Sequence, residues 1–206
     1  RYQGASLLDS SKGKRNLPDN HEGPVSMLTR LGTQDEPPQR AVYPVQGHGL
    51  CLHPDGKSGF FAANQYPDNR MVAFDTASLD VIDYVRVNRK GWYGGGHAIY
   101  TSDGKHLLIP ERYPDVPFSG NASKHYGVIS IRDASSYNII DEISCHGIAP
   151  HEITITDDGQ FLLIANYGST RDRGAGKDGQ LPEIVEPSLT IIELSSGQLI
   201  EKIAGP

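Results

Sequence analysis

The sequence predicts an all-β fold, a β-propeller, and two observations carry that prediction. The same order of residues recurs three times along the chain, and glycine and proline are abundant. Of 206 residues, 23 are glycine and 14 are proline, about half as many again as an average protein contains. This composition argues against a helical bundle and favours short strands joined by turns.

Each repeat begins with a histidine, at His48, His97 and His151. Asp-Gly pairs follow at 55–56, 103–104 and 158–159. They supply the positive φ of a tight hairpin between the first two strands of each repeat. Small polar residues at 76–78, 134–136 and 195–197 then turn the third strand into the fourth. Four antiparallel strands every 40 to 55 residues are typical of propeller blades, whereas a β-sandwich, the alternative, would not repeat this order.

We therefore expect one partial propeller domain, with blades at about 1–45 (incomplete), 46–94, 95–147 and 148–206. Residues 5–13 resemble the third and fourth strands of a blade, and residues 14–44 are expected to form a long irregular connection or a divergent outer strand. About three and a half blades cannot close a ring. We expect the open edges to be covered by a second copy of the chain, or by the remainder of a larger, usually seven-bladed, propeller.

The core is predicted from the apolar positions of the strands. Burial is expected to be highest at Leu50, Leu52, Phe60, Val72, Ile99, Leu108, Ile129, Ile131, Ile153, Ile155, Leu163 and Ile191.

The charge balance argues against nucleic-acid binding. Nineteen Lys and Arg face 25 Asp and Glu, for a net charge of −6, and no basic stripe is present to neutralise phosphates. The apolar runs are far shorter than the roughly 20 residues of a membrane-spanning helix. The chain starts at Arg1 without a leader, so we read it as processed or partial. Cys51 and Cys145 are too few for a disulfide scaffold.

Propeller geometry predicts where a site lies. The first strand of each blade lines the channel and runs down from the top face, so the three repeated histidines should stand at the channel mouth. The second strand returns to the same face and brings further polar side chains there. The candidate ligand-binding residues on this face are Asn64, Tyr66, Glu111, Arg112, Tyr113, Glu152, Asn166 and Tyr167.

His48, His97 and His151 are candidate ligands of a divalent transition metal, since neutral imidazole suits Zn, Cu, Fe or Ni. Glu152 or His146 would orient or complete such a site. In the structural alternative, each histidine hydrogen-bonds a loop of the next blade. Three consecutive blades would then place the histidines on an arc rather than around a point. A Cα separation of His48 and His151 above about 15 Å would exclude one shared ion.

Other candidates carry two interpretations each. Glu111 and Arg112 form an anion clamp or a solvated ion pair, and Glu111 with Glu152 would be an acid–base pair if they lie close enough. Cys51 and Cys145 are interpreted as buried apolar residues rather than nucleophiles. The glycines at 94–96 precede a strand, which indicates a close backbone approach and not a phosphate loop.

Several segments resemble one family. Gln46-Gly-His-Gly-Leu50, Gly95-Gly-His-Ala-Ile99 and, above all, His146-Gly-Ile-Ala-Pro-His-Glu-Ile153 are similar to uncharacterised bacterial periplasmic β-propellers with YVTN and WD40-like repeats. The resemblance covers about residues 41–203 and includes Asn166 and Glu186-Pro-Ser-Leu189. It implies a periplasmic address and, because such proteins are often encoded beside imelysin-like iron-regulated proteins, a link to metal acquisition. It implies no reaction.

Two classes of function remain. The first is a non-enzymatic binding or scaffold protein in the periplasm, with a ligand or partner site on the top face and a link to iron or other metal uptake. The second is an enzyme, either a metal-dependent oxidoreductase or a lactonase-like hydrolase, which uses the histidine cluster at the channel mouth. Propellers support both classes, so the fold alone does not choose between them.

Overall fold

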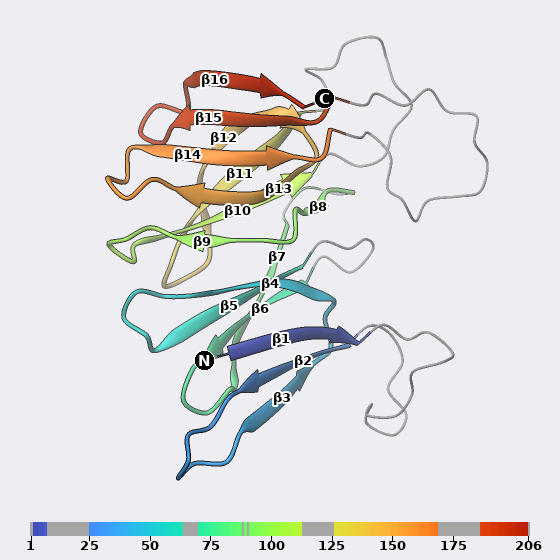
Figure 1. Ribbon diagram of the computed structural model, residues 1–206, viewed down its shortest axis with the longest axis vertical. Helices are drawn as coiled ribbons and strands as arrows, with labels where there is room; N and C mark the ends of the chain where they lie inside the picture. The colour runs from blue at the N-terminus through green and yellow to red at the C-terminus, as the bar shows by residue number, and fades with distance from the viewer. Residues whose placement is uncertain are drawn as a thin grey trace, which may run out of the picture.

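The computed structural model describes residues 2–7, 25–63, 70–87, 89, 91–112, 126–168 and 186–205. These residues form sixteen strands in four antiparallel sheets, and no helix occurs among them (Figure 1). The all-β prediction is therefore confirmed. In this described part, no helix has the length and apolar character needed to cross a membrane.

The first sheet contains three strands in the order β1 (Tyr2–Leu7), β2 (Val25–Arg30) and β3 (Gln39–Tyr43). Two more strands therefore follow β1 in its sheet, so the prediction that residues 5–13 hold the third and fourth strands is wrong. Of the two alternatives expected for residues 14–44, the outer strand is present as β3, with β2 before it, and residues 14–24 lie outside the described part. The alternating apolar signal of β3 is weak, since most of its side chains are exposed.

The other sheets contain the three complete repeats. The second runs β4 (Gly47–Leu52), β5 (Ser58–Ala63), β6 (Arg70–Asp75) and β7 (Val81–Arg86). The third contains β8 (Tyr93–Gly94), β9 (Ile99–Tyr100), β10 (His106–Arg112), β11 (Tyr126–Asp133) and β12 (Ile139–Ile148), with β8 and β9 both paired to β10. The fourth runs β13 (Pro150–Ile155), β14 (Phe161–Asn166), β15 (Ser188–Glu193) and β16 (Leu199–Ala204).

The predicted turns are present. Gly56, Gly104 and Gly159 adopt φ values of 71°, 70° and 72°, the left-handed conformation that glycine tolerates without strain. The turns between the third and fourth strands end on Leu79, Tyr137 and Gly197, at φ values of 63°, 57° and 69°. Each repeat therefore turns at the same two places.

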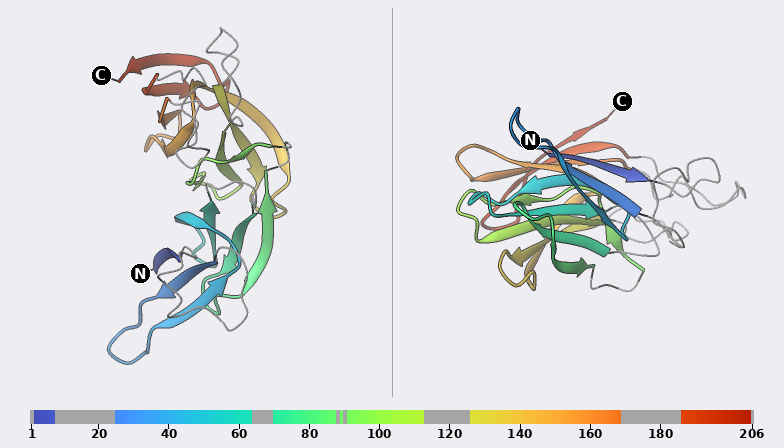
Figure 2. Two further views of the ribbon diagram at one scale, coloured as in Figure 1. Left: turned by 90° about the vertical axis from the view of Figure 1, so that its right-hand side faces the viewer. Right: turned by 90° about the horizontal axis from the view of Figure 1, so that it is seen from below.

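The four sheets follow one another around an arc, with the first and the last sheet at its separate ends (Figure 2, left). Apolar clusters fill each of the three interfaces between neighbouring sheets. Successive residues of a strand serve opposite interfaces: Phe61 packs towards the first sheet with Leu28, and Phe60 packs towards the third with Leu107. This face-to-face packing of radially arranged sheets is the architecture of a β-propeller.

Five of the predicted core residues are fully buried: Phe60, Val72, Leu108, Ile129 and Ile153. The others are not: Leu52 is 41% exposed, and Leu50, Ile99, Ile131, Ile155, Leu163 and Ile191 are half-buried. In the last sheet, Leu162, Ile164 and Ile192 pack against the third sheet. The paired Leu163 and Ile191 point the other way, where the described chain has no further blade.

The blades have two distinct ends. At the hairpin end, on the left of Figure 1, the first strand turns into the second. The opposite end is called the top face here: β4 and β13 begin there, and β5, β10 and β14 end there.

Candidate functional site

The three repeated histidines all stand where the pairing of the innermost strand is interrupted. The register of β4 with β5 shifts between Gly47 and Leu50, around His48. The register of β13 with β14 shifts between Pro150 and Glu152, around His151, and His97 lies in the gap between β8 and β9. Such irregularities turn a side chain away from its regular direction, so each blade uses one to aim its histidine.

The three imidazoles meet on the top face. Their ring centroids are 5.0 Å apart for His48 and His97, 5.0 Å for His48 and His151, and 4.7 Å for His97 and His151. One nitrogen from each ring lies within 4.8 Å of the other two. The expected arc is therefore wrong: the rings form a nearly equilateral triangle around one point, well inside the separation that would have excluded a shared ion.

Glycines allow the innermost strands to approach this closely. The Gly49 N–H donates to the Gly96 carbonyl at 2.7 Å, and a Cβ on Gly49 would lie 2.7 Å from Nδ1 of His97. A Cβ on Gly95 would lie 2.4 Å from the Pro150 carbonyl oxygen. These contacts confirm the close backbone approach predicted for residues 94–96.

Hydrogen bonds orient two of the three rings. Nδ1 of His151 donates to the carbonyl of Gly95, and Nδ1 of His97 lies 2.9 Å from the Glu152 carboxylate. Because both partners accept, each Nδ1 carries the proton, and each Nε2 keeps its lone pair. Both contacts join neighbouring blades, so these two rings have the inter-blade bonds of the structural interpretation and still offer a free nitrogen.

The surroundings favour neutral rings. Burial lowers the pKa of His151 to about 4, with a smaller contribution from the nearby His97, His48 and Arg112. Burial also lowers the pKa of His97, and His48 adds to the shift while Glu152 opposes it. Neutral imidazole is the form that binds a metal, so the proton competes little with a metal at these two rings near pH 7.

Besides Glu152, two of the predicted ligand-binding residues, Tyr167 and Arg112, lie next to the histidine cluster. The Tyr167 ring stacks on His151, with centroids 4.4 Å apart at 29°, and is 52% exposed. The Arg112 guanidinium lies over the Tyr93 ring at 5.0 Å and over the Tyr167 ring at 5.8 Å. Asn64, Tyr66 and Tyr113 lie outside the described residues.

The structure places three other candidates away from the cluster. Glu111 is fully buried and pairs with Arg132 at 3.0 Å, so it is neither in a clamp or solvated pair with Arg112 nor an accessible acid–base partner of Glu152. Asn166 is buried, and its Nδ2 donates to Thr190 Oγ1 at 3.1 Å. The ring of His146 contacts the Gly197 carbonyl at 3.3 Å, at a turn between strands.

The Gly95 carbonyl and Tyr93 had not been identified from the sequence as parts of the site. The run of glycines before His97 was the available signal, because a backbone without side chains can offer its carbonyl to a neighbouring blade.

Both thiols are buried or half-buried, which agrees with their interpretation as apolar residues. Burial raises the pKa of Cys51 to about 12, and it raises that of Cys145 to about 12 as well. Neither thiol ionises near neutral pH, and only the thiolate is a good nucleophile.

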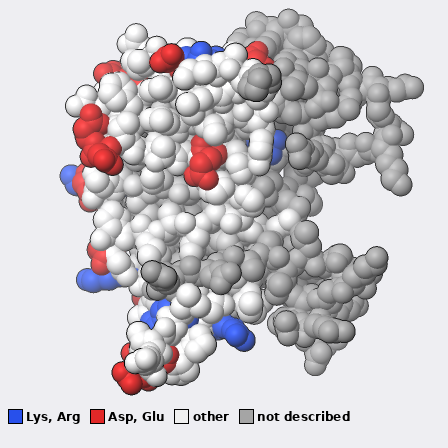
Figure 3. Space-filling view, in the orientation of Figure 1, with Lys and Arg blue, Asp and Glu red and all other residues white. Residues whose placement is uncertain are grey.

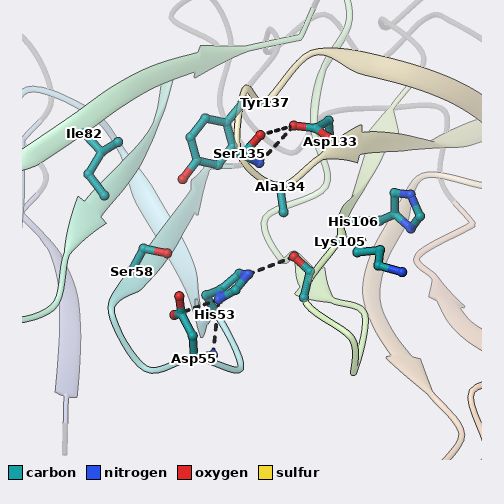
Figure 4. A pocket seen from close by; sticks show the side chains of 11 residues that line it. His53, Asp55, Ser58, Ile82, Lys105, His106, Asp133, Ala134, Ser135 and Tyr137 are labelled. Atoms are coloured by element: carbon teal, nitrogen blue, oxygen red, sulfur yellow. Dashed lines mark hydrogen bonds and ion pairs between the residues drawn. The ribbon is translucent and has the colours of Figure 1, made fainter.

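A hollow of about 590 Å³ opens at the hairpin end, between the second and third sheets (Figure 4). One of its lining residues, His53, uses both ring nitrogens: Nδ1 lies 2.7 Å from Asp55, and Nε2 lies 2.8 Å from the Gly104 carbonyl. The contact with Gly104 joins the hairpins of the second and third sheets, so we assign His53 to the fold.

Charge is dispersed over the face that the space-filling view shows. In the space-filling view, acidic and basic side chains are scattered over the coloured surface, and they form no large basic patch there (Figure 3). This distribution agrees with the net charge of −6.

Solved structures share the fold at low sequence identity. Hydrazine synthase from Kuenenia stuttgartiensis superposes with a TM-score of 0.60 at 17% identity, over 88% of this chain and 48% of that one. A functionally unknown protein from Desulfotomaculum acetoxidans gives 0.56 at 16% identity, over 88% and 50%. A protein from Bacteroides uniformis, provisionally assigned as a 6-phosphogluconolactonase, gives 0.53 at 14% identity, over 87% and 48%.

These similarities show the propeller fold alone, and the chain spans about half the length of the structures it matches. A comparison with curated proteins gave no significant match. A family model does match, over residues 41–205, with the description "Protein of unknown function (DUF1513)". It includes all three histidines and the whole of the last three sheets, and the chain therefore belongs to this family.

Proposed function

We propose that this protein is a metal-binding β-propeller that holds one divalent transition metal on its top face through His48, His97 and His151. One observation carries the proposal: three residues that the repeat places in separate blades bring their nitrogens within 4.8 Å of one another. Their inter-blade hydrogen bonds account for the orientation of two rings. They do not explain why the ring of His48 lies against the other two rings.

The dimensions suit such an ion. Nitrogens bound tetrahedrally at about 2.1 Å would lie about 3.4 Å apart, so the rings need to close by little more than 1 Å from the present separation, which side-chain rotation can supply. An all-imidazole set favours Zn, Cu, Fe, Ni or Co over Mg or Ca, which prefer oxygen. Glu152 and the Gly95 carbonyl would hold His97 and His151 in the ligating tautomer.

The proposed role is binding rather than catalysis. His48 is exposed, so three protein ligands leave a coordination position open towards the solvent. A ligand or partner that meets this position would be held on the top face of a scaffold. We extend the proposal to the periplasm and to the uptake of iron or another metal, on the family resemblance alone.

A metal-dependent enzyme is the second candidate, and the same open position supports it. Catalytic zinc sites use three protein ligands and keep the fourth position for water or substrate. A lactonase-like hydrolase would need a metal-activated water there, and an oxidoreductase would need a redox-active metal. Turnover of a lactone or of a reductant by the metal-loaded protein, lost with the histidines, would favour this candidate.

We also propose that the edges of the arc are covered in the working protein, by a second copy or by further blades. Unpaired sheet edges invite association with other chains. Sedimentation of the 206-residue chain tests this point, since a soluble, monodisperse monomer without a partner would contradict it.

The metal proposal is tested on protein purified without chelators or a histidine tag. Elemental analysis and titration with Co²⁺ or Zn²⁺ should find one ion per chain. The triple variant H48A/H97A/H151A should bind none at that site, and the control H53A/H106A, altered at the hairpin end, should keep it. Equal metal binding by the triple variant and the unaltered protein would refute the proposal.

A further inference from the structure

Arg112 is buried without the partners that a guanidinium ordinarily has. Its residue is only 9% exposed, and Nε has no hydrogen-bond acceptor. Among the described residues, Arg112 contacts the rings of Tyr93 and Tyr167 and no carboxylate. Burying a charge without a hydrogen-bonded counterion is unfavourable, so a guanidinium in this state indicates an anion that the described residues do not supply.

The comparison with Arg132 shows what a structural arginine looks like in this fold. Arg132 is 2% exposed, and it donates to the Glu111 carboxylate, the carbonyls of Arg86 and Tyr137, and the Ser130 hydroxyl. Every side of that guanidinium is satisfied within the protein. Arg112 lies at the end of the adjacent strand β10 in the same sheet, and among the described residues it has none of these bonds.

The position of Arg112 connects it to the histidine cluster. Arg112 is the last residue of β10 and pairs with Tyr93 across the sheet, so the strand delivers it to the top face. It lies 5.8 Å from the centre of the Tyr167 ring, which stacks at 4.4 Å on His151. Its positive charge acts on His151. The guanidinium and the imidazoles therefore border the same part of the face.

We propose that the top-face site takes a small molecule with a carboxylate, bound through one oxygen to the open position of the metal and through the other to Arg112. This inference rests on the metal site proposed above. A guanidinium N–H donates a strong, charge-assisted hydrogen bond to a carboxylate oxygen. A single arginine between two tyrosine rings suits a flat, singly charged group better than a phosphate.

The test uses the Co²⁺-loaded protein, with acetate as the probe and the visible absorption of the bound Co²⁺ as the signal. Acetate should change the spectrum saturably. In R112Q the apparent acetate affinity should fall about tenfold or more, the effect expected of a lost charged hydrogen bond, while the Co²⁺ affinity should change less than about threefold. The control R70Q removes a guanidinium that also lies over a tyrosine ring, at 5.8 Å from Tyr84, and should bind acetate normally.

Each outcome decides a separate point. A folded R112Q that binds acetate as tightly as the unaltered protein would overturn the carboxylate site and leave the metal site intact. Tighter binding of inorganic phosphate than of acetate would overturn the assignment of a carboxylate. Failure of the unaltered protein to bind Co²⁺ would refute the metal site and this inference with it. If R112Q does not fold, R112K replaces it and should keep Co²⁺ while losing most of the acetate affinity.

Discussion

The two ends of the blades both carry repeated polar residues, and they differ in where the partners of those residues lie. At the hairpin end, the partners are local: the Thr101 hydroxyl bonds Asp103 at 2.7 Å, and the Thr156 hydroxyl bonds Asp158 at 2.5 Å. His53 takes the same place in the second sheet, beside Asp55. On the top face, the repeated histidines lie against one another, with ring centroids 4.7 to 5.0 Å apart, and His151 also stacks on Tyr167.

This difference separates structure from function within one repeat. Copying a blade copies its hairpin, and the polar groups of each hairpin bond within that hairpin or, as for His53, to the next hairpin. Copying a blade does not explain why side chains from three blades meet, since each histidine would satisfy a purely structural role with one bond to a neighbouring loop. This contrast supports the proposed metal site on the top face.

The strongest test of this comparison replaces the histidines one at a time. Because the triangle is nearly equilateral, H48A, H97A and H151A should each weaken Co²⁺ binding by similar factors. Each loss should exceed about 100-fold, which is the largest effect expected when a residue that only orients a ligand is lost. His97, the middle member along the chain, should therefore matter no more than the other two.

The matched change at the hairpin end is H53A. It should lower the free energy of unfolding, because it removes the bond to the Gly104 carbonyl, and should leave Co²⁺ affinity within about threefold. Isothermal titration measures the affinities. A loss of metal affinity in H53A equal to that in the cluster variants would remove the distinction between the two ends.

A smaller effect is expected from E152Q. The amide keeps the size of the side chain but removes the charge that faces Nδ1 of His97. Changing a residue that orients a metal ligand costs about 10- to 100-fold in affinity. The exposed Glu201 of β16 provides the control, as E201Q should bind Co²⁺ normally. Normal binding by E152Q would mean that Glu152 does not orient the ring.

The sequence was enough to predict the propeller and the placement of His48, His97 and His151 on one face, because both follow from the spacing of the repeat. It was not enough to predict that the rings meet at one point. That outcome depends on the interruptions at His48, His97 and His151, which are properties of strand pairing between residues distant in the chain. No regular alternation within one strand reveals them.

The errors have equally physical causes. Glu111 and Arg112 are neighbours in sequence, but alternation along β10 sends them to opposite sides, so Glu111 pairs with Arg132 inside the blade. The positions of the strands in the first sheet were predicted wrongly, because only short segments of this sheet resemble the repeat. Leu163 and Ile191 have the apolar character of core residues, and only the arrangement of blades shows that the sheet face they occupy has no described neighbour.

The same glycine-to-alanine substitution, made at Gly49 and at Gly56, compares the two ends of the blades. G49A would place a Cβ 2.6 Å from the Gly96 carbonyl oxygen and 2.7 Å from Nδ1 of His97, so it should displace the ring and lower Co²⁺ affinity about tenfold or more. G56A meets nothing within 4 Å but keeps φ at 71°. It should cost about 1 kcal/mol of stability with metal binding unchanged. Unchanged Co²⁺ affinity in G49A, together with a loss of affinity in G56A, would contradict the placement of His97.

The smallest effect is the pH dependence of the metal-free protein. The pKa of His151 is about 4 in the folded chain and about 6.5 in an unfolded one. Between those values the unfolded state binds more protons, so the free energy of unfolding should decrease as the pH falls from about 6.5 to about 4. His97, whose pKa is also lowered, acts in the same direction.

At the hairpin end the same linkage operates at lower pH. Hydrogen bonds hold the pKa values of Asp55, Asp103 and Asp158 below their usual range, so their stabilisation is complete above about pH 4 and is lost only as the pH falls below it. Urea unfolding at pH 7, 5.5, 4.5 and 3.5 separates the two windows. H151N, whose amide can still donate to the Gly95 carbonyl, should make the dependence between pH 6.5 and 4 shallower. D158N should change only the part below about pH 4. An unchanged slope between pH 6.5 and 4 in H151N would show that His151 is not the buried, neutral ring that the cluster requires.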